Sequence, residues 1–133
     1  MRVNDVPATI LELAETSHPG ESYGGRELIP MSGISALDYL TGGAESVHGD
    51  DPLGFELYGN RALIKGDWKA MLIWPPDGDG QWALYDLRSD PGELDDLAAR
   101  FPDRLETMIG EWEAYAEQNG VAVYERDLGY GRY

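Results

Sequence analysis

The sequence predicts an α+β fold: a small antiparallel sheet of about four strands, packed by a long C-terminal helix and preceded by two shorter helices. Turn dipeptides divide the middle of the chain into short β-branched and aromatic runs, and an apolar stripe with helical spacing follows them. With 133 residues, the chain is long enough for one domain with a small core. We expect a single domain over residues 1–133, with a helical and loop lead-in (1–52), a sheet with its helix (53–120) and a tail (121–133).

The first lead-in helix is predicted over Asn4–Thr16. Asn4 or Asp5 would accept hydrogen bonds from the free N–H groups of the first turn, and Pro7 is tolerated there because it has no N–H to lose. The motif His18-Pro19-Gly20 is expected to stop the helix. One face of the helix is apolar, formed by Val6, Ile10, Leu13 and Ala14.

A second, shorter helix is predicted over Ser35–Leu40. Ser32 is expected to cap its start, and Gly42-Gly43 to end it. The intervening segment Glu21–Ser32 is rich in glycine, proline and charge, which predicts a loop, and Ala44–Pro52 is expected to be another loop.

The sheet is expected to be a meander of four antiparallel strands. Gly59-Asn60, Gly66-Asp67 and the run from Asp77 to Gly80 are turn signals, because glycine and asparagine tolerate positive φ. Such a meander ordinarily has one wet and one buried face. The predicted strands are Gly54–Tyr58, Arg61–Lys65, Trp68–Trp74 and Trp82–Asp86.

The last helix is expected to begin at Pro102 and to end before Asn119-Gly120. Asp103 and Glu106 suit the positive end of its dipole. Beyond it, Val121–Tyr124 is a candidate edge strand ahead of a tyrosine- and glycine-rich end. The apolar stripe of the helix comprises Leu105, Met108, Ile109, Trp112, Tyr115 and Ala116.

Composition excludes several classes of function. The chain carries 25 acidic and 10 basic residues, a net charge of −15, which argues against nucleic acid or an anionic membrane as its partner. It has no cysteine, which excludes disulfides, thiolate metal sites and a cysteine nucleophile. We expect a soluble chain without a leader of its own, although a leader upstream would serve a larger protein of which this chain is a piece.

One sequence pattern suggests a serine hydrolase. The segment Gly20–Gly24 matches G-x-S-x-G, with Ser22 at the nucleophile position, and Asp38 and His48 follow in the order of a catalytic triad. The mechanism needs a strand entering that turn and a helix leaving it, whereas loops are expected on both sides of Ser22. Catalysis by Ser22 is therefore not favoured.

Two candidate metal sites are also weak. Asp77-Gly78-Asp79-Gly80 has the start of a calcium loop, but Arg88 occupies the twelfth position, where a glutamate is needed, and a hairpin turn explains all four residues. His48 with Asp50 and Asp51 is more consistent with a solvated loop, and His18 with a residue at the end of a helix.

The remaining distinctive residues have structural interpretations. Asp90-Pro91-Gly92-Glu93 has the composition of a tight turn, and Glu93, Asp95 and Asp96 favour a short helical turn that ends near Ala98. Packing between the sheet and the last helix is the simplest role for the tryptophans, and an aromatic ligand platform is the alternative. The tryptophans are Trp68, Trp74, Trp82 and Trp112.

Four segments together resemble the C-terminal part of type I sulfatases, which are arylsulfatase-like members of the alkaline phosphatase superfamily. Residues 5–14 resemble the "D-x-x-P-T-x-L-x-L-A" helix, with Ala8 inserted and Glu15 where the family usually has glycine. Residues 34–40 resemble the short helix "S-L-L-P-x-L", and residues 66–69 resemble "G-x-W-K". The most specific match is residues 84–98 to "L-Y-D-L-x-x-D-P-x-E-x-x-N-L-A", in which Asp96 replaces the usual asparagine.

The resemblance implies a four-stranded sheet crossed by a long helix, packed on a large α/β domain that hydrolyses sulfate esters. That chemistry uses a formylglycine made from a C/S-x-P-x-R motif and a divalent cation, usually calcium, all expected upstream of this segment. The single Ser-x-Pro here, Ser89-Asp90-Pro91, is followed by Glu93 where arginine is required. We therefore expect no catalytic, metal-binding or cofactor-binding residue in this chain.

Two functional hypotheses remain from the sequence. The first is a C-terminal sulfatase domain that is inactive alone and partners either a sulfatase N-terminal α/β domain or a second copy, through an exposed apolar face. The second is an acidic α+β binding module derived from a sulfatase. Neither hypothesis predicts a nucleic-acid or membrane partner, and the cellular location is not predicted.

Overall fold

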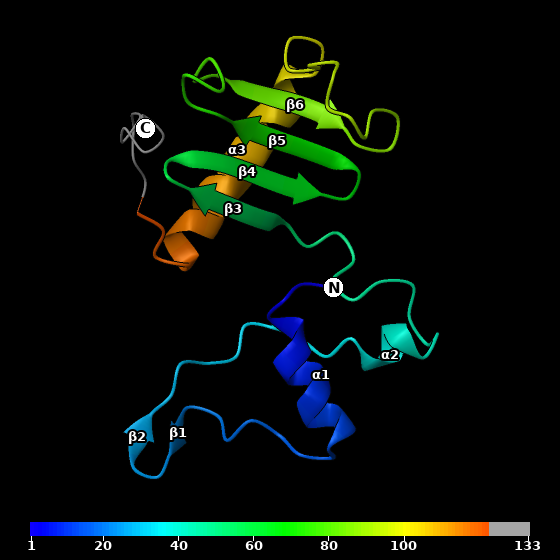
Figure 1. Ribbon diagram of the computed structural model, residues 1–133, viewed down its shortest axis with the longest axis vertical. Helices are drawn as coiled ribbons and strands as arrows, with labels where there is room; N and C mark the ends of the chain where they lie inside the picture. The colour runs from blue at the N-terminus through cyan, green and yellow to red at the C-terminus, as the bar shows by residue number, and fades with distance from the viewer. Residues whose placement is uncertain (123–133) are drawn as a thin grey trace. The chain divides into compact units, whose positions relative to one another are not determined.

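The computed structural model describes residues 1–122, which contain two antiparallel sheets and three helices and confirm the α+β prediction (Figure 1). The chain divides into two compact units, Met1–Gly49 and Asp50–Tyr133. The expectation that they form one domain stays a prediction. Within residues 1–122, no helix has both the length and the apolar character needed to span a bilayer.

The main sheet is an antiparallel meander in which each strand pairs with the next along the chain. All four strands were predicted, with ends that differ by at most two residues. The first turn lies one residue earlier than expected: Tyr58 and Gly59 have φ of 53° and 87°, and Asn60 already pairs with Leu57. Positive φ at both positions characterises a type I′ hairpin. The strands are β3 (Leu53–Leu57), β4 (Asn60–Lys65), β5 (Trp68–Leu72) and β6 (Trp82–Asp86).

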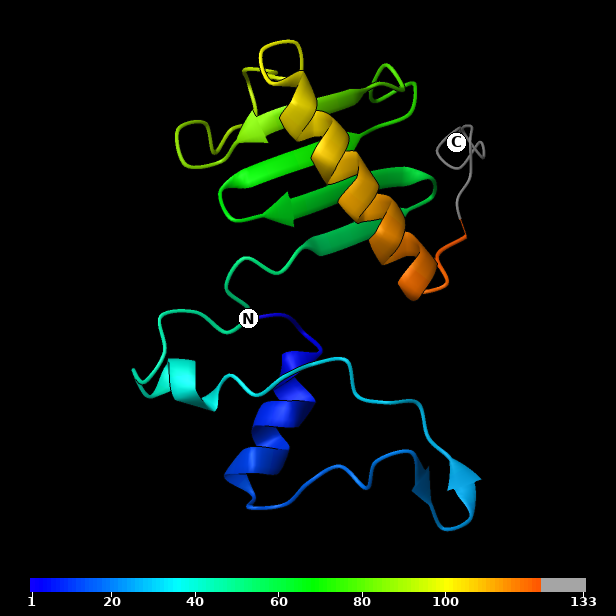
Figure 2. The same ribbon diagram turned by 180° about the vertical axis from the view of Figure 1, so that it is seen from behind.

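Helix α3 (Pro102–Gln118) lies across one face of this sheet (Figure 2). The register places one residue of each strand in a single row beneath it, and the helix contributes the facing side of the core. Gly54 occupies the edge of that row because an added Cβ would lie 2.2 Å from the Tyr115 ring. The row is Gly54, Leu63, Ala70 and Leu84, and the buried helix residues are Met108, Trp112 and Ala116.

Three of the four tryptophans pack between the sheet and α3, as predicted. Trp112 is buried, and Trp68 and Trp82 pack at the edge of the same core. The prediction is wrong for Trp74, which is not part of this cluster. Its Nε1 donates to the Gly59 carbonyl oxygen at 3.1 Å, and its backbone N–H donates to Asn60 Oδ1 at 2.9 Å. Trp74 therefore ties the end of β5 to the first hairpin.

The end of α3 follows the prediction. Gly120 has φ of +62°, and Val121 N–H donates to the Ala116 carbonyl oxygen at 2.8 Å, which is the hydrogen bond of a Schellman motif. Val121 packs against the core. Of the predicted edge strand Val121–Tyr124, Val121 and Ala122 lie in no strand, and the rest lies outside the described residues together with the tail.

In the first unit, helix α1 (Asp5–Leu13) is shorter than predicted at both ends. It stops before His18-Pro19-Gly20 because Glu15 turns the chain with φ of +52°. Thr16 N–H then donates to the Leu11 carbonyl oxygen at 3.0 Å, which makes this end a Schellman motif as well. The predicted cap is also wrong. The Asn4 side chain does not cap the first turn, and the Asp5 carboxylate accepts the N–H group of Arg2.

Helix α2 (Leu37–Leu40) is a single turn that ends in the expected glycine motif. Gly42 has φ of +81°, and Gly43 N–H donates to the Asp38 carbonyl oxygen at 2.8 Å. Ser32 is not its cap, because the Ser32 hydroxyl accepts a hydrogen bond from the Asn4 side chain at 3.0 Å. Instead, Ser35 Oγ accepts the Leu37 N–H at 3.2 Å.

The segment predicted as a loop contains a short hairpin, β1 (Ser22–Tyr23) paired with β2 (Arg26–Glu27). Gly24 and Gly25 join the two strands with φ of 58° and 77°. A Gly-Gly pair with positive φ at both positions is a recognised hairpin signal, which explains why this segment pairs despite its polar composition.

Replacing Glu15 by glycine is expected to stabilise α1 by about 0.5–1 kcal/mol, because a left-handed backbone conformation strains any residue with a Cβ. Hydrogen exchange of the α1 amides should slow accordingly. As a control, Glu12→Gly, inside the same helix, should accelerate exchange, since glycine costs about 1 kcal/mol in a helix interior. Equal effects of the two variants would contradict this account of the helix end.

Candidate interaction surface

The face of the sheet opposite α3 is apolar and uncovered by any helix of its own unit within the described residues (Figure 1). Two cross-strand rows form it, and none of their eight residues is fully buried, whereas Leu63, Ala70 and Leu84 on the other face are 0 % exposed. Phe55, on the edge strand, is 46 % exposed. We call this surface the open face: Phe55, Ala62, Met71 and Ala83 in one row, and Leu53, Ile64, Lys69 and Tyr85 in the other.

An ordinary meander presents polar side chains on its second face. Here only Lys69 of the eight residues is charged, so this face lacks the polar side chains with which an isolated meander would face solvent. A contiguous apolar surface of this kind marks an interaction site more often than free protein surface. The sequence led us to expect an exposed apolar face; the open face is apolar, with Phe55 exposed and its other seven residues half-buried.

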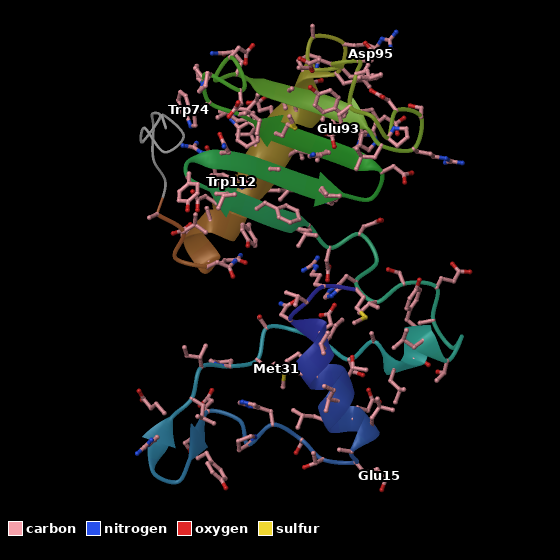
Figure 3. All side chains as sticks on the ribbon, viewed as in Figure 1. Glu15, Met31, Trp74, Glu93, Asp95 and Trp112 are labelled. Carbon is pink, nitrogen blue, oxygen red and sulfur yellow. The ribbon has the colours of Figure 1, made fainter. Side chains whose placement is uncertain are left out.

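Lys69 is held by an ion pair with Glu93, which is labelled in Figure 3. The Lys69 Nζ lies 2.6 Å and 2.8 Å from the two carboxylate oxygens of Glu93. The backbone of Glu93 has φ of +56°, which turns the chain after Asp90-Pro91-Gly92. Two segments that the sequence singled out separately, residues 66–69 and 84–98, therefore meet in one contact.

Carboxylates rather than helical hydrogen bonds organise residues 90–98. The tight turn is confirmed, because Glu93 N–H donates to the Asp90 carbonyl oxygen at 3.2 Å. No helical turn follows, contrary to prediction. Asp90 Oδ2 instead accepts the N–H groups of Leu94 and Asp95, at 2.7 Å and 2.9 Å. Acidic residues are favourable here because they accept backbone hydrogen bonds.

Asp96 fixes this segment to the edge strand β6. Its Oδ1 accepts the N–H of Leu84 at 3.0 Å and that of Ala98 at 2.9 Å, and Leu97 N–H donates to the Leu84 carbonyl oxygen at 2.8 Å. Backbone groups of the edge strand are thereby satisfied by the turn, which also shields that edge from pairing with another chain.

The acidic turn also acts on Tyr85 of the open face. Burial raises the pKa of the Tyr85 phenol, and the carboxylates of Asp96, Glu93 and Asp90 raise it further. All three carboxylates therefore lie near enough to influence this end of the open face. A partner that covers it would meet negative potential beside apolar side chains.

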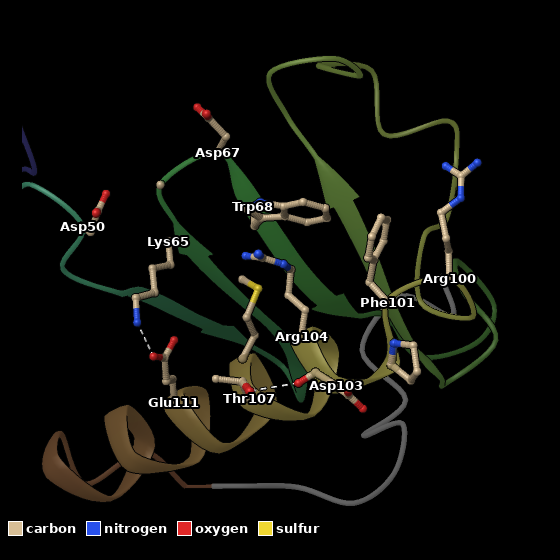
Figure 4. Close-up of a pocket in the computed structure, with 13 residues that line it drawn as sticks. Asp50, Lys65, Asp67, Trp68, Arg100, Phe101, Asp103, Arg104, Thr107 and Glu111 are labelled. Atoms are coloured by element: carbon tan, nitrogen blue, oxygen red, sulfur yellow. Dashed lines mark hydrogen bonds and ion pairs between the residues drawn. The ribbon is translucent and has the colours of Figure 1, made fainter.

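A cleft of about 800 Å³ lies on the other side of the sheet, at the start of α3 (Figure 4). The Arg104 guanidinium lies 4.3 Å from the centre of the Trp68 ring, and Phe101 meets that ring edge-on at 5.5 Å. Lys65 pairs with Glu111. Two of its cationic side chains thus already have partners within the cleft, and packing between the sheet and the helix accounts for their positions.

The residues of the candidate serine hydrolase are not arranged as an elbow. Ser22 lies in the two-residue strand β1, which leads into a hairpin rather than a helix. Asp38 belongs to α2, and His48 Nε2 contacts the carboxylate of Asp5, which is not a member of the triad. The strained strand-to-helix turn that exposes such a serine is absent from this segment.

Two of the candidate metal residues, Asp79 and His18, accept backbone hydrogen bonds. Asp79 Oδ1 accepts the Gln81 N–H at 2.8 Å, and Gly80 N–H donates to the Ile73 carbonyl oxygen at 2.9 Å, as expected of a turn. His18 Nδ1 accepts the Gly20 N–H at 3.2 Å. Across residues 1–122 there is no group of three or more histidine, cysteine, aspartate or glutamate side chains that could hold a metal ion.

One buried polar pair was missed by the sequence analysis. The Asp5 carboxylate is 0 % exposed, and its oxygens lie 2.9 Å and 3.0 Å from His48 Nε2. Asp5 also accepts the Ile34 N–H at 3.2 Å. Burial by itself raises the pKa of Asp5, but the hydrogen bonds from Arg2, His48 and Ile34 outweigh it and lower the pKa below its usual value. Asp5 therefore joins three separate parts of the first unit.

The fold of this chain recurs as part of larger proteins of known structure. A Bacteroides thetaiotaomicron protein (BT33336S-sulf), from a genetic locus for the metabolism of glycosaminoglycans, superposes with a TM-score of 0.64 at 19% identity, over 85% of this chain and 24% of that one. BT4656, solved with its substrate D-glucosamine-2-N,6-O-disulfate, matches with a TM-score of 0.61 at 16% identity, over 87% and 24%. Ps i-CgsB, solved with a neocarrahexaose, matches at 0.63 and 18% identity, over 92% and 26%.

Sequence comparison identifies the class of protein more closely than the structural matches do. No family model matches the chain. An uncharacterized sulfatase of Schizosaccharomyces pombe is 42% identical over 128 residues, which are 95% of this chain and 23% of that protein. This match confirms the resemblance to the C-terminal part of sulfatases, and the chain spans about a quarter of the length of the relatives that it matches.

Removing the Asp96 side chain is expected to lower the free energy of unfolding by about 1–2 kcal/mol, because Asp96→Ala leaves the Leu84 and Ala98 N–H groups without their acceptor. Asp96→Asn should cost much less, since the amide oxygen accepts the same bonds. Asp95→Ala, at an exposed neighbour, is the control. Urea unfolding would measure all three, and an asparagine variant as unstable as the alanine variant would contradict this role.

The first unit should lose stability in acid. A lowered pKa means that Asp5 contributes stability above its unfolded-state value of 3.8, and that this contribution is lost as the pH falls through the lower folded-state value. Exchange or chemical shifts of the α1 amides between pH 6 and pH 2 would report it. Asp5→Asn should remove most of this dependence and destabilise the unit at pH 6, whereas an unchanged acid profile would contradict the assignment.

Proposed function

We propose that this chain serves as the C-terminal part of a sulfatase and is inactive by itself. The observation that carries the proposal is the 42% identity to a sulfatase over 95% of this chain but only 23% of the relative. A match of this extent supports a role for the chain as one module of a larger architecture. The remaining three quarters of such an enzyme would then carry out the hydrolysis of sulfate esters.

The open face supports this proposal and suggests where the partner binds. Its two rows hold six aliphatic, methionine or phenylalanine residues, and no helix of the described second unit covers them. In a sulfatase, the N-terminal α/β domain would supply the missing layer and remove this apolar surface from water. The Lys69–Glu93 pair and the Asp96 hydrogen bonds would hold the rim of that surface in shape.

The residues present do not fit the cofactors of the family. The chain has no cysteine, and its Ser89-Asp90-Pro91 is followed by Glu93 where the formylglycine motif requires arginine. Residues 1–122 provide no group of three or more histidine, cysteine, aspartate or glutamate side chains suited to a divalent cation. A net charge of −15 also disfavours binding of a sulfated substrate by this chain alone. Nucleophile, cation and sulfate recognition are therefore assigned to the other part of the enzyme.

The test is a chimera in which this chain replaces the matching 23% of the Schizosaccharomyces pombe sulfatase. We expect the chimera to fold with a single cooperative melting transition and to retain the activity of its parent on an aryl sulfate such as 4-nitrophenyl sulfate. The parent with the matching segment deleted should have neither property, and the isolated chain should show no hydrolysis.

Three results would contradict the proposal. Hydrolysis by the isolated chain would assign chemistry to its own residues. A deletion variant that melts and acts like its parent would show that the segment is dispensable. An isolated chain that is a highly stable monomer, combined with a chimera that does not fold, would favour a stand-alone binding module.

A further inference from the structure

The pair Asn119-Gly120 at the end of α3 has a reactivity that the helix end alone does not account for. The chain has three asparagines, Asn4, Asn60 and Asn119, and of these Asn119 alone precedes a glycine. A side-chain amide in that position is open to attack by the next backbone nitrogen, because glycine has no Cβ to hinder the approach. Asn119 and Gly120 are both exposed, so water reaches them.

We propose that Asn119 is a site of spontaneous deamidation, with water as the co-reactant. The Gly120 backbone nitrogen loses its proton and forms a bond to Asn119 Cγ, while the Cγ–Nδ2 bond breaks and ammonia leaves with that proton. Water then adds to one of the two carbonyl carbons of the cyclic imide and opens the ring. The product is an aspartate or an isoaspartate, in which the main chain runs through the former side chain. Nothing is oxidised or reduced.

The folded end of α3 holds the reacting groups apart. Gly120 N–H, the attacking group, donates to the Glu117 carbonyl oxygen at 3.2 Å. Asn119 Nδ2, the leaving group, donates to the Tyr115 carbonyl oxygen at 2.8 Å. A ψ of 5° at Asn119 also turns the Gly120 nitrogen away from the side chain, so closing the ring needs a rotation about the Cα–C bond. The reaction therefore requires the last turn of α3 to open.

This opening disrupts few contacts. Glu117, Gln118 and Asn119 are all exposed, and Val121, which closes the helix end through its hydrogen bond to the Ala116 carbonyl oxygen, is only half-buried. Helix ends open at a much lower free energy than the whole fold. The last turn is therefore expected to open many times for each global unfolding of the chain.

Deamidation would make this opening hard to reverse. An aspartate has no N–H to donate, so its carboxylate would face the Tyr115 carbonyl oxygen. Negative charge at the end of a helix also opposes the helix dipole, and α3 already carries Glu113 and Glu117 near this end, with no basic residue in its last turn. An isoaspartate adds a methylene group to the main chain, which displaces Val121 from the position in which its N–H reaches Ala116.

The end of α3 supports one edge of the core. Ala116 is 4 % exposed, and Val121 packs against the same cluster. Tyr115 lies so close to the edge strand β3 that an added Cβ on Gly54 would be 2.2 Å from its ring. Opening the last turn would therefore loosen the contact between α3 and β3. Deamidation of Asn119 would thus be a slow, one-way loss of packing at this edge of the sheet.

The test compares the full chain in buffer and in concentrated urea at mildly alkaline pH, with circular dichroism to verify that the first sample is folded. Peptide mapping by mass spectrometry detects the exchange of NH₂ for OH at each asparagine. We expect Asn119 to react faster than Asn4 and Asn60. Its rate in the folded chain should be about tenfold or more below that in urea, because only the opened helix end reacts. An unreactive Asn119 in urea would overturn the site, and equal rates in both samples would overturn its protection by the helix end.

Two glycine variants separate local opening from global unfolding. Gln118→Gly weakens the last turn of α3, and Glu106→Gly weakens its first half; both positions are exposed, and glutamine and glutamate have similar helix propensities. Relative to the rate of each variant in urea, Gln118→Gly should accelerate deamidation of the folded chain about threefold, and Glu106→Gly should change it little. Equal acceleration in both variants would mean that the reaction follows global unfolding, and the local mechanism would be wrong.

A third pair of variants tests the consequence for packing. Asn119→Asp reproduces the charged product and should lower the protection of the Gly120 and Val121 amides against hydrogen exchange about two- to fivefold. Asn119→Gln keeps a neutral amide and should lose less protection. If the two variants are equally protected, the proposed loss of packing is contradicted. This chemistry needs only the chain itself, so its outcome is independent of the sulfatase chimera.

Discussion

The packing of Trp112 against one face of the sheet is the contact on which the rest of the second unit depends. Its ring is 1 % exposed, its Nε1 donates to the Phe55 carbonyl oxygen at 3.0 Å, and Trp82 meets it edge-on at 6.0 Å. It links the edge strand β3, the distant strand β6 and the middle of α3. A buried aromatic with a satisfied polar atom gives both apolar burial and a fixed orientation. The helix therefore has one position on the sheet.

This arrangement has a consequence for function. One helix can cover only one face of the sheet, and α3 covers the face that contains Leu63, Ala70 and Leu84. The opposite face keeps aliphatic and aromatic residues that one-sided sheets usually replace by polar ones. A sequence under no requirement to cover that face would be free to accept polar residues there. The apolar character of the open face is thus the feature of the second unit that the proposed partner domain would account for.

Sequence reasoning was sufficient wherever short-range physics decided the structure. Period-two alternation and glycine turns located all four strands, and the stripe through Met108 and Trp112 located α3. It failed where partners lie far apart along the chain. Asp5 contacts Ile34 and His48, which are 29 and 43 residues away, and no local pattern indicates that a carboxylate at a helix start will be buried by them. The apolar face of α1 with Val6, Ile10 and Leu13 was found from its spacing, but which way it faces depends on those same distant contacts.

The motif that relates this chain to the sulfatases is itself structural. Asp90 and Asp96 accept backbone hydrogen bonds, and Glu93 holds Lys69, the last residue of the other recognisable segment. Asparagine, the usual residue at position 96, has an oxygen that accepts the same bonds, so the substitution by Asp96 preserves the geometry. A motif of this kind indicates how the backbone groups of an edge strand are satisfied; it does not indicate the position of catalytic residues. It can identify the architecture of a chain without identifying any residue for catalysis, and for that reason the proposed function depends on the surfaces the fold leaves uncovered.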